Sequence, residues 1–182
     1  MAAQELQSIL RTLEAAVTQS GKTLPELSRT SPVLLVFLRH AGCPFCREAL
    51  SDLARSRFAI ESTGARIVLV NMGDSKALEK QLRRYGLAGM DLISDPGRKL
   101  YKALGLRRGS LWQLFGPKAV WRFFCGGVFA GHGMGWISAD LFQMPGLFLL
   151  DRARIVRSFR HRCAADRPDY AGICATALKT RA

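Results

Sequence analysis

The spacing of apolar residues changes along the chain and divides it into predicted elements. Within residues 4–18, apolar positions recur every three or four residues, which predicts an amphipathic helix. Residues 33–38, VLLVFL, form an unbroken apolar run that is typical of a strand buried on both faces of a sheet. Between them, residues 21–32 contain one glycine and two prolines, which favours a connector without regular structure.

Helical and strand-like patterns then alternate as far as residue 104. The predicted helices are 47–60, 75–85 and 98–104, and the predicted strands are 65–70 and 90–94. Further along, residues 146–150 and 155–159 predict a β-hairpin, and residues 169–178 predict a last helix. This order indicates an α/β fold in which helices flank one sheet. We expect residues 1–30 to form an N-terminal helix and connector, and residues 31–182 to form a single domain.

Residues 105–139 break the alternation because they are rich in aromatic residues and glycine. They predict one or two short helices and a glycine-rich loop. We interpret the aromatic part, 110–124, as core or as a cover over an active site. A surface for a membrane or a partner protein is the alternative.

Composition narrows the class of protein. The 182 residues are 48% hydrophobic and 23% charged, which is enough for one core and too apolar for a disordered chain. Five cysteines are too few, and odd in number, for a disulfide scaffold. No apolar run resembles a membrane span and the N-terminus lacks a signal-peptide pattern, so we expect a soluble cytoplasmic protein.

Basic residues outnumber acidic ones by 27 to 14, which gives a formal net charge of +13. Seven basic residues and no acid lie within residues 98–122, and six arginines accompany one acid, Asp166, within residues 152–167. Such blocks suit phosphates, anionic lipid or an acidic protein, although solvated faces are the simpler interpretation. No nucleic-acid-reading motif accompanies the charge, so nucleic acid is not an expected partner.

The strongest chemical signal is the C-P-F-C motif at residues 43–46, directly after the buried strand and at the start of a predicted helix. The free N–H groups of a helix N-terminus favour an anion, so they would stabilise a thiolate at Cys43. Arg39 and Arg47 add positive charge nearby. We therefore predict that Cys43 attacks a disulfide or a peroxide and that Cys46, one turn later, resolves the product.

Other interpretations of the motif are a metal site or two reduced thiols without a redox role. Zinc needs four ligands, and the sequence holds neither a second paired-cysteine motif nor a paired-histidine motif, so no metal or other cofactor is expected. The remaining cysteines stand singly. We expect Cys125 and Cys174 to be buried, whereas the basic neighbours of Cys163 favour some reactivity.

A second signal is Met144-Pro145, which directly precedes a predicted strand. A proline at a strand entry often has a geometric role, and X–Pro bonds adopt cis at low cost. A cis bond would expose the backbone of Met144 to an extended substrate, and an ordinary trans-proline is the alternative. Together with Pro44 and Phe45, which shape the turn between the cysteines, Met144 and Pro145 are our predicted substrate-contacting residues.

Several segments carry a resemblance to a known family. They are 34–50 (LLVFLRHAGCPFCREAL), 95–106, 140–162 and 164–170. They resemble the thioredoxin superfamily and, within it, the peroxiredoxin-like, selenoprotein-L-like redoxins of the alkyl hydroperoxide reductase/thiol-specific antioxidant group. The resemblance implies a thioredoxin-like fold with a helical, aromatic-rich insertion before the hairpin, a redox pair Cys43 and Cys46, and a cis-proline at Pro145. It also implies thiols, disulfides or hydroperoxides as reaction partners and a thioredoxin- or glutathione-type electron donor.

The sequence departs from a typical peroxiredoxin at two positions. Val36 and His40 stand where the proline and the hydroxyl residue that frame a peroxide would be. Of the two roles for His40, polarising a peroxide or lying at the surface as a capping residue, we favour the second. We therefore expect an antioxidant dithiol oxidoreductase that reduces disulfides in preference to hydroperoxides. The alternative is a redox-inactive or redox-sensing module whose basic faces dock acidic partners.

Overall fold

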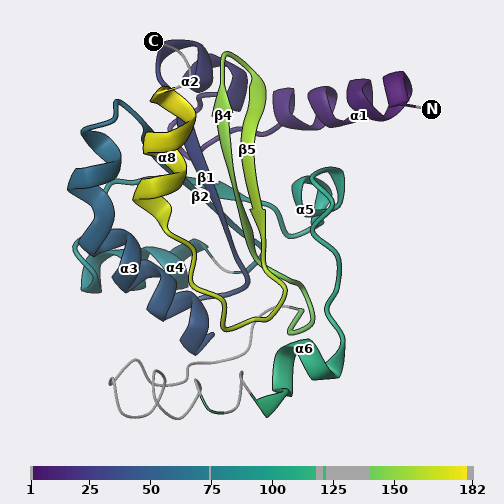
Figure 1. Ribbon diagram of the computed structural model, residues 1–182, viewed down its shortest axis with the longest axis vertical. Helices are drawn as coiled ribbons and strands as arrows, with labels where there is room; N and C mark the ends of the chain where they lie inside the picture. Colours follow the sequence, from purple (N-terminus) through teal and green to yellow (C-terminus); the bar gives the residue numbers. More distant parts are fainter. Residues whose placement is uncertain (1, 74, 118–120, 122–139, 180–182) are drawn as a thin grey trace.

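The computed structural model describes residues 2–73, 75–117, 121 and 140–179 (Figure 1). Its elements follow in the order α1 (Ala2–Glu14), α2 (Leu24–Thr30), β1 (Val33–Leu38), α3 (Pro44–Glu61), β2 (Arg66–Asn71), α4 (Ser75–Arg84), β3 (Asp91–Ser94), α5 (Lys99–Ala103), α6 (Leu111–Phe115), β4 (Gly146–Asp151), β5 (Arg154–Arg160) and α8 (Tyr170–Lys179). This order confirms the predicted α/β class.

The five strands form one mixed sheet in the order β3-β2-β1-β4-β5. Strand β1 pairs in parallel with β2 and antiparallel with β4, so it lies at the centre of the sheet. All of its residues are buried, as the continuous apolar run predicts. Because β1, β2 and β3 run in the same direction, their carboxyl ends meet at one edge.

Two layers of helices cover the sheet (Figure 1). Helices α3, α4 and α8 pack on the face that carries Leu34, Val36 and Leu38, whereas α1, α2 and α5 pack on the face that carries Leu35 and Phe37. Side chains of a strand alternate between its two faces, so β1 supplies apolar groups to both cores.

Helix α2 lies where the sequence predicted only a connector, so that prediction is wrong. The Thr23 hydroxyl accepts a hydrogen bond from the Glu26 amide, the Glu26 carboxylate accepts one from the Thr23 amide, and Pro25 occupies the first turn. This capping box starts a helix in a segment whose prolines suggested a break, because proline is tolerated in the first turn of a helix.

The tip of the β4–β5 hairpin turns through Arg152 and Ala153, which both have left-handed backbone conformations (φ 47° and 61°). Helix α2 holds this tip. The Arg152 amide donates to the Ser28 carbonyl oxygen at 2.8 Å, and the Ala153 amide donates to the Ser28 hydroxyl at 3.1 Å. These two bonds stabilise a conformation that residues with a side chain rarely adopt.

Tyr101 of α5 fixes the edge of the sheet at which β1 and β2 end. The side chain is fully buried, and its hydroxyl lies within hydrogen-bond distance of the carbonyl oxygens of Leu38 and, at 3.1 Å, Val70. Leu38 is the last residue of β1, so this contact anchors the start of the loop that leads to Cys43.

The described part of the aromatic segment is mostly helix α6. Its Trp112 is 75% exposed and Leu111 is 67% exposed, so the interpretation of the segment as core is wrong for these side chains. The predicted glycine-rich loop and Cys125 lie outside the described residues. Within the described ranges, no helix combines the length and the apolar character that crossing a bilayer requires.

Candidate functional site

The C-P-F-C motif lies where β1 ends and α3 begins, at the lower end of the molecule in Figure 1. Cys43 is the N-cap of α3 and has an extended backbone, and Pro44 is the first helical residue, where no amide hydrogen is needed. Arg47 Nε donates to the Ala41 carbonyl oxygen at 2.9 Å and so holds the loop against the first turn. The helix begins three residues earlier than predicted, which places Cys46 inside its first turn.

Arg39, the first residue after β1, binds the Cys43 sulfur. Its Nη2 lies 2.8 Å from Cys43 Sγ, and its Nη1 donates to the Leu141 carbonyl oxygen at 2.8 Å. Cys43 is only 2% exposed, and burial favours a neutral thiol. The hydrogen bond from the Cys46 thiol, the charge of Arg39 and the Cys46 amide outweigh burial and hold the pKa of Cys43 well below that of an ordinary thiol.

Cys46 is also buried, but its pKa shifts in the opposite direction. Its sulfur accepts a hydrogen bond from the Arg39 amide at 3.2 Å. Its hydrogen bond to Cys43, its burial and the negative charge of Cys43 raise the pKa of Cys46 well above that of an ordinary thiol. The motif therefore combines a thiolate with a protonated thiol one turn away, an arrangement able to attack a sulfur or an oxygen and then close a disulfide.

His40 is 2% exposed, so the expectation of a surface or capping residue is wrong. Within the described residues, neither of its ring nitrogens has a hydrogen-bond partner. Burial and the charges of Arg39 and Arg47 lower the pKa of His40, although Cys43 acts in the opposite direction. The result is a neutral imidazole close to the thiolate.

A small cavity lies beside Cys46. Its volume of about 20 Å³ suffices for one water molecule, and its lining includes Phe45, Cys46, Pro145, His161 and Tyr170. The structure thus brings two of the predicted substrate-contacting residues, Phe45 and Pro145, next to the Cys46 sulfur.

Two acidic residues that the sequence analysis missed also line this cavity. Glu48 and Asp52 of α3 are buried, and Arg167 pairs with both: its Nε lies 2.6 Å from Asp52 Oδ2, and its Nη1 lies 3.4 Å from Glu48 Oε1. The i,i+4 spacing of the two acids, directly after the motif, was the available signal. Arg167 is 115 residues from Asp52, so no local pattern indicates the pairing.

The Met144–Pro145 bond is trans, because the described chain contains no cis peptide bond, so the expectation of a cis-proline is wrong. The Met144 amide donates to the Arg107 carbonyl oxygen at 3.2 Å, and the Met144 carbonyl accepts from the Gln143 side chain at 3.3 Å. An antiparallel bridge between Arg108 and Gln143 keeps this segment extended, the conformation favoured before a trans-proline. These bonds occupy the backbone groups that we expected to pair with a substrate.

The other described cysteines are free thiols away from the motif. Cys174 of α8 is buried, as predicted, and burial raises its pKa to about 11. Cys163 is partly exposed, and its amide donates to the Asp166 carboxylate at 2.9 Å. Burial makes Cys174 an unreactive thiol, so among the buried sulfurs that the structure describes only Cys43 has an environment that favours ionisation.

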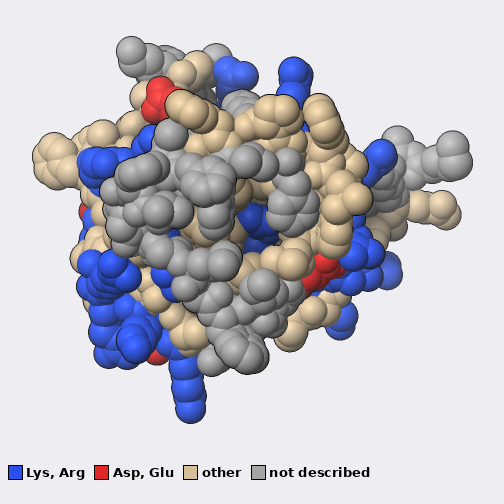
Figure 2. Space-filling model, turned by 90° about the horizontal axis from the view of Figure 1, so that it is seen from below, with Lys and Arg blue, Asp and Glu red and all other residues tan. Residues whose placement is uncertain are grey.

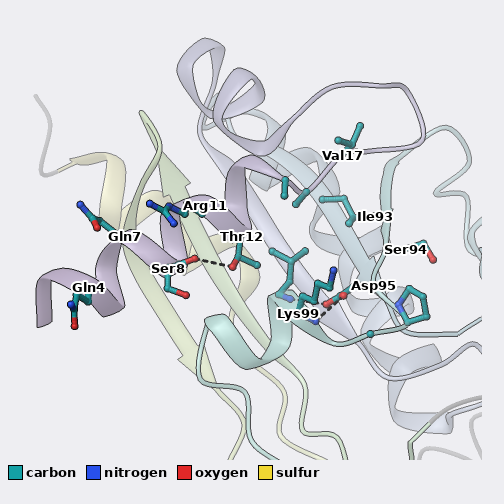
Figure 3. A pocket seen from close by; sticks show the side chains of 15 residues that line it. Gln4, Gln7, Ser8, Arg11, Thr12, Val17, Ile93, Ser94, Asp95 and Lys99 are labelled. Carbon is teal, nitrogen blue, oxygen red and sulfur yellow. Dashed lines mark hydrogen bonds between the residues drawn. The ribbon is translucent and has the colours of Figure 1, made fainter. Parts of the chain in front are cut away.

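A larger groove, of about 770 Å³, lies between α1 and the loop that joins β3 to α5 (Figure 3). Its lining contains no cysteine or histidine, and several of its polar groups bond to each other. The Thr12 hydroxyl donates to the Ser8 carbonyl oxygen, and the Asp95 carboxylate accepts from the Lys99 amide at 2.9 Å. The groove offers neither a thiol nor an imidazole, so we assign the thiol chemistry to the motif.

The sequence model of the AhpC/TSA family matches residues 11–159. The chain is 32% identical over 108 residues to a prostamide/prostaglandin F synthase of Salmo salar, an alignment that covers 59% of this chain and 53% of that protein. It is 28% identical over 150 residues to peroxiredoxin-like 2C of Bos taurus, covering 75% and 63%. The chain therefore spans between half and two thirds of the length of these two relatives.

Solved structures show similarity of fold at lower identity. Peroxidoxin BcpB of Mycobacterium tuberculosis superposes with a TM-score of 0.61 at 15% identity, covering 91% of this chain and 90% of that one. A Xanthomonas campestris peroxiredoxin Q gives 0.58 at 16%, covering 91% and 87%. A secreted disulfide oxidoreductase of Mycobacterium tuberculosis gives 0.55 at 14%, covering 93% and 98%. The fold is thus the thioredoxin-like α/β fold of the peroxiredoxins.

Proposed function

This chain belongs to the AhpC/TSA family, and from that premise we propose that it is a thiol-dependent oxidoreductase in which Cys43 and Cys46 form the working dithiol. The observation that carries the proposal is the position of Arg39 between the two sulfurs. Its guanidinium lies against Cys43 and its amide bonds to Cys46, so one residue supports both the thiolate and its partner.

The proposed cycle consists of two displacements. The Cys43 thiolate attacks one sulfur of a disulfide RSSR, a mixed disulfide forms, and RS⁻ leaves. Cys46 then loses its proton, attacks the Cys43 sulfur, expels the second RS⁻ and closes the 43–46 disulfide. Two electrons pass from the protein to the substrate. The proton of Cys46 finishes on one RS⁻, and the other RS⁻ takes a proton from water, equal to the one that Cys43 released when it ionised. A thioredoxin- or glutathione-type donor returns the electrons.

We favour disulfides over hydroperoxides as the substrate class. Val36 and His40 occupy the positions at which typical peroxiredoxins carry the proline and the hydroxyl that frame a peroxide. Reduction of a hydroperoxide is the alternative. In that case Cys43 attacks the terminal peroxide oxygen, ROH leaves, and Cys46 displaces water from the resulting sulfenic acid. The neutral imidazole of His40, which lacks a partner within the described residues, supports this alternative as a hydrogen-bonding group for the peroxide.

Turnover assays separate these outcomes. Bis(2-hydroxyethyl) disulfide and cumene hydroperoxide are offered to the protein with an NADPH-coupled thioredoxin or glutathione donor. We expect faster turnover of the disulfide, complete loss in Cys43→Ser, and a trapped mixed disulfide in Cys46→Ser. Cys174→Ser is the matched control and should behave as the unaltered protein. Failure to turn over either substrate, or activity that survives in Cys43→Ser, would exclude the proposal.

A further inference from the structure

An open groove of about 530 Å³ borders the site on the side of Pro145. Its lining includes arginines, apolar side chains and one histidine: Gly105, Leu106, Arg107, Arg108, Gln113, Met144, Pro145, Arg160 and His161. Pro145 and His161 also line the small cavity beside Cys46, so these two residues form the wall between the groove and the resolving sulfur.

Positive charge dominates this groove. Three arginines line it and no acidic residue does. The Arg107 side chain is exposed and has no ion-pair partner among the described residues. Arg160 Nη2 donates to the Leu104 carbonyl oxygen at 3.0 Å, a bond that orients the guanidinium but leaves its charge in place. Arg108 pairs with Asp140 at 3.0 Å.

Figure 2 shows this end of the molecule from below, with Lys and Arg side chains along much of its border and few acidic ones. Basic side chains thus outnumber acidic ones on this face and give it a positive field, to which the three arginines of the groove add. Such a field raises the local concentration of anionic molecules near the site.

The wall of the groove is apolar and neutral. Leu106, Met144 and Pro145 provide the apolar part. Burial lowers the pKa of His161 to about 4, so its ring is a neutral hydrogen-bonding group, and its buried Nδ1 has no partner within the described chain. An apolar wall under a rim of arginines suits a small molecule that has an organic body and an anionic end.

We propose that this groove binds the carboxylate of the small molecule whose reactive bond is cleaved at Cys43, a proposal that rests on the proposed function. The planar guanidinium of arginine binds a carboxylate through two parallel hydrogen bonds, which a point charge cannot do. The groove adjoins the motif through the small cavity, because Pro145 and His161 line both, and Arg39, which contacts Cys43, also lines that cavity. The preferred substrates are therefore anionic disulfides or peroxides rather than neutral ones.

Binding is tested first, without turnover. S-methylglutathione, which carries two carboxylates and no reactive sulfur, is titrated calorimetrically into the reduced protein at constant ionic strength. We expect Arg107→Gln to weaken its binding about fivefold, the upper range for one exposed charge pair. Arg154→Gln is the control. It removes an equal charge at the start of β5, whereas the groove lies at the Arg160 end, and it should change the affinity by less than about twofold. Absence of saturable binding, or equal weakening in both variants, would overturn the proposal.

Turnover provides the second readout. Oxidised glutathione and neutral bis(2-hydroxyethyl) disulfide are compared in the unaltered protein and in Arg107→Gln. The variant should show a KM about fivefold higher for oxidised glutathione, with kcat unchanged and no change for the neutral disulfide. Equal effects on both disulfides would overturn the groove assignment. If neither disulfide is reduced while S-methylglutathione binding behaves as expected, the proposed function fails and the anion site stands.

Discussion

The surroundings of Cys43 and Cys46 differ although the two sulfurs are one helical turn apart and similarly buried. Cys43 contacts the guanidinium of Arg39, whereas Cys46 lines a small cavity that Glu48 and Asp52 also line. The pKa of the first is lowered and that of the second is raised. Burial alone would raise both pKa values, so the guanidinium beside Cys43 and the direction of the hydrogen bond between the sulfurs decide which thiol ionises first.

Arg39→Met is expected to reduce the difference in pKa between Cys43 and Cys46 the most. Without the guanidinium, burial dominates at Cys43, so its pKa rises and less thiolate is present at neutral pH. Alkylation by iodoacetamide at pH 6 should slow by about tenfold or more, since a neighbouring Arg shifts an acid's pKa by about 1–3 units. Arg154→Met is the control, and thermal unfolding verifies that both variants fold. An unchanged alkylation rate would show that Arg39 does not stabilise the thiolate.

A comparable effect is expected when the hydrogen bond between the two sulfurs is removed. In Cys46→Ala the Cys43 thiolate loses a donor, so its alkylation at pH 6 should slow by about tenfold, the effect of a hydrogen bond to a charged group. Cys46→Ser keeps a donor and should retain most of the rate. If both variants react at the same rate, the hydrogen bond contributes nothing to the low pKa of Cys43.

The two thiols should also give stability opposite dependences on pH. Because the pKa of Cys43 is lowered on folding, its stabilisation is present above the pKa of an unfolded thiol, about 8.5, and is lost as pH falls through the folded value. Because the pKa of Cys46 is raised, its stabilisation is present below about 8.5 and is lost as pH rises. Urea unfolding of the reduced protein from pH 6 to 9.5 measures this. In Cys43→Ala the free energy of unfolding should rise less as pH increases. In Cys46→Ala it should decline less at the alkaline end of the range.

The smallest effect on the sulfurs is expected from Arg167→Met. This change removes a partner of Glu48 and Asp52 on the Cys46 side, and about 1 kcal/mol of unfolding free energy should be lost, because the pair is partly exposed. Alkylation of Cys43 should keep its rate. Urea denaturation and alkylation on the same samples test both statements, and a slower Cys43 would mean that the two surroundings are not independent.

Local patterns allowed much of this arrangement to be predicted. The apolar run of β1 and the motif at a helix start are contiguous in sequence, so they indicated the site and its central strand directly. Arg39 was predicted only as a nearby charge. Its contact with the sulfur depends on the Leu141 carbonyl, which orients the guanidinium and lies 102 residues away.

Other features depend on contacts that no local pattern encodes. The buried state of His40 follows from the packing around the end of β1, although the residue type alone suggested a surface position. The trans bond before Pro145 depends on pairing with Arg107, on a distant segment. Helix α2 is different, since Thr23 and Glu26 form a capping box that is visible in the sequence and was outweighed by the prolines.

The contact between Ser28 and the hairpin tip has a consequence for where this fold can be shortened. Pro145 lies just before the first strand of the hairpin and His161 just after the second. The tip, at the opposite end, is held by Ser28, which precedes β1 in the chain. A truncated protein that starts at residue 31 would leave that tip without its two external bonds. We therefore regard α2 as part of the minimal folding unit, and a redox domain prepared without it would test a different hairpin.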